Sequence, residues 1–328
     1  MEKYLVGVDL DNTLLTNDKT ITDETVEFVR NFVARGNYFV IATGRPFQGA
    51  LDFYKRLGVN MPLIATNGGA IFFFSDDLDT TKEVVDFSMN KNTFLSLFKE
   101  VKHMLWAYQV RCPFSYHYLD YNKIPFYILH ESPRVSMHEN DIETSLINNP
   151  IDADFCVNKE FKDEFERIIK NYPQFKYISW GEINGYYAYE VSSINSSKGI
   201  ALDYLRKKYN IKKENVFGFG DQLNDLDLLK VHYGCAMINA TDEIKNLANY
   251  VTKKDNNNNG VIEFISEILN KNSWDLQGFY INSNSNSIGS WSEKENPFKF
   301  LLPPSVCITL QLLTFIFSLT TKPSALQT

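Results

Sequence analysis

The stretch YLVGVDLDNT, residues 4–13, decides which fold this chain can adopt. Its first half is a short apolar run, which is typical of a strand buried on both faces of a parallel sheet. The carboxylates of Asp9 and Asp11 follow at the point where that strand must end. We therefore expect a buried first strand with two acidic side chains at its carboxyl end.

The segments after this strand alternate between helical and extended patterns. A helix is expected after Thr22, which can cap it, and Gly36 can end it. Apolar strands are expected at residues 38–42 and 63–66, with a helix at residues 49–57 between them. This order of strand, helix and strand predicts right-handed crossovers and a parallel sheet.

The middle of the chain follows a different pattern. Between about residues 82 and 190, the order strand, helix, strand, strand occurs twice, and Asn184-Gly185 between alternating runs predicts a hairpin. Alternation of helix and strand resumes after Val191, with one helix expected at residues 224–230. The sequence therefore predicts an α/β fold, a Rossmann-like doubly wound parallel sheet with an inserted α+β domain.

Composition narrows the class of protein. The 328 residues are 44% hydrophobic and 22% charged, which is typical of a folded globular chain, and the net charge of −7 argues against a broad basic surface for nucleic acid. The four cysteines show no CxxC spacing, and the five histidines match no metal-ligand spacing. The apolar N-terminal run is interrupted by Asp9 too early for a signal peptide. We expect reduced thiols and a cytoplasmic location.

The last part of the chain, residues 271–328, does not continue this pattern. Residues 281–290 are rich in Asn and Ser, and residues 306–319 are largely apolar. The apolar stretch is shorter than the roughly 18–20 residues that a membrane-spanning helix needs. We expect a tail of unknown role that is not part of the fold, and no membrane association is predicted.

Polar side chains follow three of the expected strands. These segments are Asp9–Thr13, Thr43–Arg45 and Gly220–Asp225. In an open parallel sheet, ligands bind beyond the carboxyl ends of the strands, so the three segments should share one crevice that holds four carboxylates. Such a crevice needs a cation, and its oxygen ligands suit Mg²⁺. A metal ion would also keep Asp9 ionised and able to act as a nucleophile.

These motifs, together with Lys198 ahead of an expected helix, resemble those of the haloacid dehalogenase superfamily and occur in the same order. Asn239-Ala240 and Gly260-Val261 make the chain similar to the Cof-type sugar-phosphate phosphatases, which have a C2 cap. The resemblance covers about residues 1–270. It implies a catalytic core from residues 1–81 and 191–270, a cap at residues 82–190 that sets specificity, a Mg²⁺ cofactor, and a small phosphorylated metabolite as the substrate.

The resemblance also implies a role for each matching residue. Asp9 would attack phosphorus to form an aspartyl phosphate, and Asp11 would protonate the leaving group and then activate water. The phosphate-binding residues would be Leu10, Thr43, Gly44, Lys198 and Asn224, with Leu10 and Gly44 acting through their backbone. The metal-binding residues would be Asp9, Asp11 through its carbonyl, Asp221, and Asp225 as an outer partner.

Several alternatives remain open at the level of sequence. A calcium loop starting at Asp9 is excluded, because Leu14 and Thr20 stand where that loop needs Gly and Glu. Asn224 could instead cap a helix, and Arg45 is expected to be a structural ion-pair partner. Two other functions remain: a phosphomannomutase-like hexose phosphate mutase, and a regulator that binds phosphometabolites without turnover. The sequence does not define the oligomeric state.

Truncation after Lys271 tests the expectation for the tail. A chain of residues 1–271 should keep the melting temperature and the phosphatase activity of the full chain, because the predicted fold ends near Asn270. Differential scanning calorimetry and a phosphate-release assay measure both properties. A large fall in melting temperature would show that the tail stabilises the folded chain.

Overall fold

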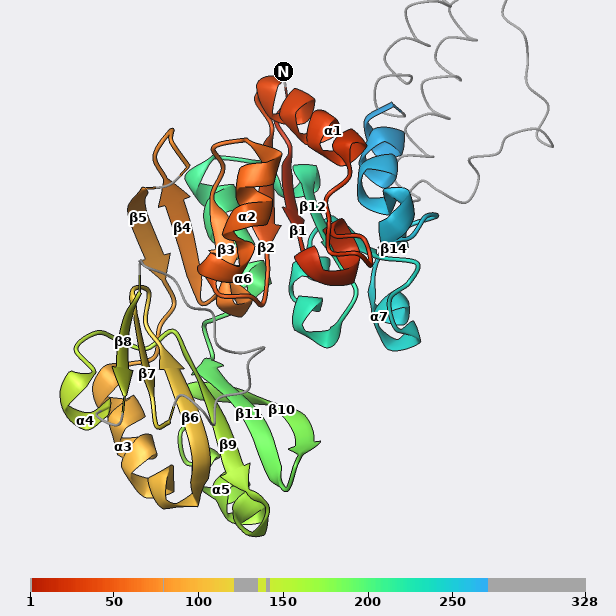
Figure 1. Cartoon of the computed structure of the whole chain (residues 1–328). Coiled ribbons are helices and arrows are strands. Elements are labelled where there is room, and N and C mark those ends of the chain that lie inside the picture. Colours follow the sequence, from red (N-terminus) through yellow and green to blue (C-terminus); the bar gives the residue numbers. More distant parts are fainter. Residues whose placement is uncertain (1, 79, 121–134, 140–141, 271–328) are drawn as a thin grey trace, which may run out of the picture. The chain divides into compact units, whose positions relative to one another are not determined.

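The computed structural model in Figure 1 describes residues 2–78, 80–120, 135–139 and 142–270. The described residues up to Ile268 form one compact unit. The tail at residues 271–328, with its Asn/Ser-rich and apolar segments, lies outside the described residues.

The larger sheet has eight strands in the order β14-β13-β12-β1-β2-β3-β4-β5. The strands are β1 (Leu5–Val8), β2 (Tyr38–Ala42), β3 (Leu63–Ala65), β4 (Ala70–Phe74), β5 (Thr81–Asp86), β12 (Val216–Gly220), β13 (Tyr233–Ala236) and β14 (Tyr250–Val251). All neighbours from β14 to β3 are parallel, and the β3–β4 and β4–β5 pairs are antiparallel. All four residues of β1 are buried, as expected for the central strand of a covered sheet.

Helices cover this sheet on both sides, with α1 and α2 nearer the viewer and α6 behind it in Figure 1. They are α1 (Asp23–Ala34), α2 (Phe47–Leu57), α6 (Lys198–Lys208), α7 (Asp242–Leu247) and a final helix that starts at residue 260. The hydroxyl of Thr22 accepts a hydrogen bond from the backbone N–H of Thr25, which confirms the expected cap of α1. Leu202 and Leu205 of α6 belong to the same buried cluster as Leu5 of β1.

The second sheet has six strands in the order β10-β11-β9-β6-β7-β8, and among the described residues α3 precedes its first strand while α4 and α5 lie between its strands. Its elements are α3 (Lys91–Val101), β6 (Leu105–Arg111), β7 (Ser115–Tyr118), β8 (Ser136–Glu139), α4 (Ile142–Ser145), β9 (Asp152–Asn158), α5 (Lys162–Ile169), β10 (Phe175–Ile183) and β11 (Tyr186–Ser193). Aromatic side chains such as Phe155 and Phe165 form its core. Asn184 and Gly185 have φ of 51° and 88° in the β10–β11 turn, so the expected hairpin is present.

The two sheets divide at different residues from those expected. The boundary expected between residues 81 and 82 falls inside β5, which pairs with β4 in the larger sheet. The boundary expected between residues 190 and 191 falls inside β11, which pairs with β9 and β10. Sequence pattern shows where strands occur but not which sheet each strand joins. We therefore propose that the inserted domain lies between Asp86 and Ser193.

The chain after β12 also differs from the expected helix at residues 224–230. It forms two short 3₁₀ turns, Leu223–Asp225 and Leu228–Lys230. The reason is local, because the Oδ2 atom of Asp225 accepts hydrogen bonds from the backbone N–H groups of Asp221 and Gln222. This folds the segment back on itself and turns the side chain of Asp225 inward.

The described part of the chain contains no helix that is both long enough and apolar enough to cross a membrane.

Candidate active site

A cleft of about 810 Å³ lies at the carboxyl ends of β1, β2, β3 and β12, with residues of the second sheet on its other wall. The lining residues that follow strands of the larger sheet are Asp9, Asp11, Asn12, Thr43, Gly44, Arg45, Pro46, Asn67 and the run Asp221–Asn224. Residues from the second sheet include Arg111, Asp154, Tyr177, Trp180, Tyr189 and Glu190. The expected convergence of the three polar segments on one crevice is therefore present.

The side chain of Lys198 lies beside this cleft and is fully buried. Its Nζ atom is 2.6 Å from Oδ1 of Asp9 and 2.6 Å from Oδ1 of Asp225. Burial alone would lower the pKa of this ammonium, but Asp225 and Asp9 outweigh burial and raise the pKa above its usual value. Lys198 thus stays charged, and it joins the start of α6 to the ends of two central strands.

The pKa of Asp9 is also raised, but for a carboxyl group a raised pKa disfavours the charged form. Burial, together with repulsion from Asp225 and Asp221, outweighs the attraction of Lys198 and raises the pKa of Asp9 to about 7. Burial and the neighbouring Asp225 also raise the pKa of Asp221. One ammonium therefore does not compensate three clustered carboxylates, and additional positive charge would stabilise their ionised forms.

Among the described residues, Asp9, Asp221 and Asp225 form a group that could hold a metal ion, with one oxygen of each within 4.8 Å of the others. All three are buried, and an oxygen-only donor set fits Mg²⁺. Asp221 is oriented by the hydroxyl of Thr13, which donates to its Oδ1 at 3.2 Å. The carboxylate of Asp11 is not part of this group, so any part that Asp11 takes in binding a metal falls to its carbonyl.

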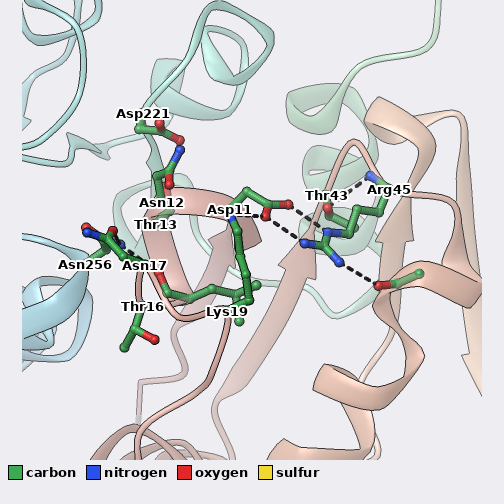
Figure 2. Close-up of polar contacts among 12 residues, drawn as sticks. Asp11, Asn12, Thr13, Thr16, Asn17, Lys19, Thr43, Arg45, Asp221 and Asn256 are labelled. Atoms are coloured by element: carbon green, nitrogen blue, oxygen red, sulfur yellow. Dashed lines mark hydrogen bonds and ion pairs between the residues drawn. The ribbon is translucent and has the colours of Figure 1, made fainter. Parts of the chain in front are cut away.

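The carboxylate of Asp11 is turned toward Arg45 and Lys19 (Figure 2). Arg45 makes two hydrogen bonds to it of 2.7 Å each, and Lys19 Nζ lies 2.9 Å from its Oδ1. Burial opposes ionisation, but these bonds outweigh it and lower the pKa of Asp11 to about 2. Arg45 thus forms an ion pair, as expected, and the other member of the pair is Asp11.

Thr43 and Asn224 are connected through a residue that the sequence reasoning did not select. The Oγ1 atom of Thr43 accepts from the backbone N–H of Arg45 at 3.1 Å. Asn67 donates its own backbone N–H to the carbonyl of Thr43 and accepts at Oδ1 from Nδ2 of Asn224, both at 3.0 Å. A Cβ atom on Gly44 would lie 3.0 Å from the same Oδ1, so a glycine leaves room for this amide. Asn67 lies two residues after the end of β3, and the rule that ligands bind at strand ends could have found it.

The wall of the cleft formed by the second sheet was not predicted from the sequence either. Arg111 is buried and makes hydrogen bonds to Asp152 at 2.7 and 2.8 Å and to Asp154 at 2.6 Å. Glu190 lines the cleft beside them, and burial with repulsion from Asp154 raises its pKa. Trp180 is 54% exposed at the same wall. These residues show no spacing in the sequence that connects them to the acidic motifs.

Comparison with known proteins gives a consistent family. A family model described as haloacid dehalogenase-like hydrolase matches residues 6–265. The 5-amino-6-(5-phospho-D-ribitylamino)uracil phosphatase YitU of Bacillus subtilis is 26% identical over 276 residues, which cover 80% of this chain and 97% of that protein. A second phosphatase of the same name and organism, YcsE, is 26% identical over 257 residues, covering 76% of this chain and 89% of its own.

Solved structures agree with the fold. A haloacid dehalogenase-like hydrolase from Bacteroides thetaiotaomicron has a TM-score of 0.65 at 22% identity and covers 81% of this chain and 100% of its own. A haloacid dehalogenase-like hydrolase from B. subtilis has a TM-score of 0.60 at 21% identity and covers 80% of this chain and 99% of its own. These matches confirm the expected fold class, an α/β fold with a parallel sheet and an inserted cap.

Thermal stability tests the metal site. At a Mg²⁺ concentration about 100 times its Kd, binding should stabilise the wild-type chain by about 2.7 kcal/mol and raise the melting temperature by several degrees. Asp221→Asn should lose most of this shift, because it removes one of the three clustered carboxylates. Asp52→Asn changes an exposed acid and should retain the full shift in melting temperature. An equal shift in the wild type and in Asp221→Asn would place the ion elsewhere.

Proposed function

The chain belongs to the haloacid dehalogenase-like hydrolases, and from this membership we propose that it is a Mg²⁺-dependent phosphatase that hydrolyses small phosphorylated metabolites through an aspartyl-phosphate intermediate. The expected enzyme class, a phosphoric monoester hydrolase of this superfamily, is confirmed by the family match and by the phosphatase names of its relatives. One observation supports the proposal most strongly: the carboxylate of Asp9 lies in the cleft, bonded to a buried lysine and next to two further carboxylates.

The reaction takes place in two steps at Asp9. An oxygen of its carboxylate forms a bond to phosphorus while the bond from phosphorus to the ester oxygen breaks, and Asp11 gives a proton to the departing alkoxide. Water then attacks phosphorus and gives a proton to Asp11, and the bond between Asp9 and phosphorus breaks to release phosphate. A bound Mg²⁺ would neutralise charge on the phosphoryl oxygens. Asp9, Asp221 and the carbonyl of Asp11 would hold it, with Asp225 as an outer partner.

Other residues of the cleft position the phosphoryl group. Thr43, through its hydroxyl, and Gly44 and Leu10, through their N–H groups, provide donors at the ends of β2 and β1. Lys198 compensates the charge near Asp9 as the phosphoryl group transfers, and Asn224 offers an amide N–H. Such fixed donors contribute through positioning and charge stabilisation, which dominate phosphoryl-transfer catalysis.

Asp11 must change partners for this chemistry. A general acid works best when its pKa is near the working pH, and the ion pairs with Arg45 and Lys19 hold the pKa of Asp11 at about 2. The phosphate of a substrate is an alternative anion for both cations. We therefore propose that substrate binding draws Arg45 and Lys19 away from Asp11 and frees it to carry a proton.

The wall of the cleft that the second sheet forms, which we call the cap wall, favours a neutral leaving group. The charge of Arg111 is compensated by Asp152 and Asp154, and Glu190 adds a further carboxylate to the wall. Carboxylates accept hydrogen bonds from hydroxyl groups and repel anions. A polyol phosphate such as a sugar phosphate fits this wall, and the relatives YitU and YcsE are named for a phosphate ester of a ribityl group. The proposal retains the expected cytoplasmic location.

Phosphate release from an aryl phosphate tests the proposed activity. The wild-type chain should release phosphate when Mg²⁺ is present, and Asp9→Asn should lower kcat at least about a thousandfold, because the nucleophile is removed. Asp52→Asn, the same change at an exposed position, should leave kcat unchanged. Full activity in Asp9→Asn would contradict the mechanism. Interconversion of hexose phosphates without net release would favour a mutase, and tight binding without turnover would favour a regulator.

A matched pair of substrates tests the cap wall. Glycerol 3-phosphate and 3-phosphoglycerate differ by one carboxylate, and kcat/KM should be about tenfold higher for the neutral alcohol, a difference of about 1.4 kcal/mol. Asp154→Asn should reduce this ratio because it removes a negative charge from the wall. Asp163→Asn, on the exposed side of α5, serves as the control. Equal rates for both substrates in the wild type would refute selection by charge.

A further inference from the structure

A short stretch of left-handed backbone follows β3. Thr66, Asn67 and Gly68 have φ of 53°, 50° and 83°. Glycine and asparagine adopt this region readily, but a β-branched residue such as Thr66 does so at a cost. Backbone in such a conformation persists only where its surroundings hold it, and it often occurs at functional sites.

The surroundings of this turn are parts of the candidate active site. Thr66 donates its backbone N–H to the carbonyl of Arg45 at 2.9 Å, and Asn67 donates to the carbonyl of Thr43 at 3.0 Å. A Cβ atom on Gly68 would lie 2.1 Å from the carbonyl carbon of Ser197, so the turn packs directly against the start of α6. The turn therefore has little freedom to move relative to Thr43 and Lys198.

The side chain of Asn67 connects two parts of the cleft that are far apart in the sequence. It is 9% exposed, and its Oδ1 accepts from Nδ2 of Asn224 at 3.0 Å. Its Nδ2 donates to Oε1 of Glu190 at 2.8 Å. Asn224 belongs to the loop after β12, and Glu190 lies on β11 in the second sheet. The amide of Asn67 thus joins the loop after β12 to β11 of the cap.

The direction of these bonds is fixed by chemistry. An ionised carboxylate can only accept hydrogen bonds, so Glu190 requires the NH₂ group of Asn67 to face it. The oxygen of Asn67 must then face Asn224, which requires Asn224 to present its own NH₂ group. An amide NH₂ has two N–H bonds, and one of them remains for a ligand in the cleft. The acceptor oxygen at position 190 therefore determines which way both amides point.

We propose that Asn67 is a positioning residue, through which Glu190 of the cap orients the amide of Asn224 toward the phosphate of the substrate. This inference rests on the proposed phosphatase function, because it needs a phosphate beside Asn224. Asn67 itself forms no bond in the reaction. Its role is to make phosphate affinity depend on the contact between β11 and the turn after β3.

A double-mutant cycle with inorganic phosphate tests the proposal without turnover. In the presence of Mg²⁺, Asn67→Asp should weaken phosphate binding about tenfold, because two buried carboxylates then face each other. Glu190→Gln alone should change the Kd less than about threefold, because the oxygen of the new amide can still accept from Asn67. In the double variant, the amide introduced at position 190 can donate to the carboxylate introduced at position 67, which can still accept from Asn224. At least half of the lost binding free energy should therefore return. Isothermal titration calorimetry measures each Kd, and the cycle isolates the coupling.

A control and two further readouts exclude simpler explanations. Asn60→Asp is the matched control, since Asn60 donates to Asp76 at 2.9 Å on the surface, and its phosphate Kd should not change. If the double variant binds phosphate no better than Asn67→Asp, the added charge alone explains the loss and the inference is wrong. If the phosphate affinity of every variant rises and falls with its melting temperature, the role of Asn67 is purely structural and the inference is also wrong.

The proposed function and this inference can fail separately. If the variants show coupling between positions 67 and 190 in phosphate binding, but the wild-type chain releases no phosphate, the phosphatase function is refuted and the role of Asn67 is retained. A wild-type chain that releases phosphate from an aryl phosphate but shows no coupling between positions 67 and 190 would refute the inference alone. A wild-type chain that does not bind inorganic phosphate at all would overturn the inference, because Asn224 would then have no phosphate to contact.

Discussion

The site depends on one buried ammonium group. Lys198 is fully buried, and its Nζ atom contacts Asp9 and Asp225 at 2.6 Å each. A lysine without solvent is stable in its charged form only beside anions, and closely packed carboxylates are stable only beside a cation. This mutual requirement fixes the start of α6, the end of β1 and the turn after β12 relative to one another. The negative charge that remains makes a Mg²⁺ site chemically reasonable.

The rest of the cleft is organised around that centre by groups from distant parts of the chain. Asn67 bonds to Asn224 on one side and to Glu190 of the cap on the other. The wall around Arg111 carries more acidic than basic groups and lines the same cleft. We propose that phosphoryl chemistry takes place at the larger sheet and that the inserted sheet selects the leaving group. The Asn67 amide is the link that we propose between them.

The sequence was sufficient where a signal is local. A buried strand followed by polar residues located Asp9, Thr43 and Asp221, because parallel strands bring their carboxyl ends to one edge. The sequence was insufficient where the outcome depends on tertiary partners. The expected helix at residues 224–230 is replaced by two turns because the side chain of Asp225 bonds its own backbone. β5 joins the larger sheet because its partner is β4. The bonds from Arg45 to Asp11 and the whole cap wall connect residues with no shared pattern, so only the folded chain reveals them.

The central claim is that Asp9 becomes phosphorylated. Acid quenching of the Asp11→Asn variant during reaction with an aryl phosphate tests it most directly, because an aryl oxide needs little help from an acid, whereas the attack of water then lacks its base. Peptide mass spectrometry of the quenched protein should find one phosphoryl group on the peptide that contains Asp9, and hydroxylamine should remove it. Phosphate release with no phosphoryl group on Asp9, or with the group on another residue, would contradict the account.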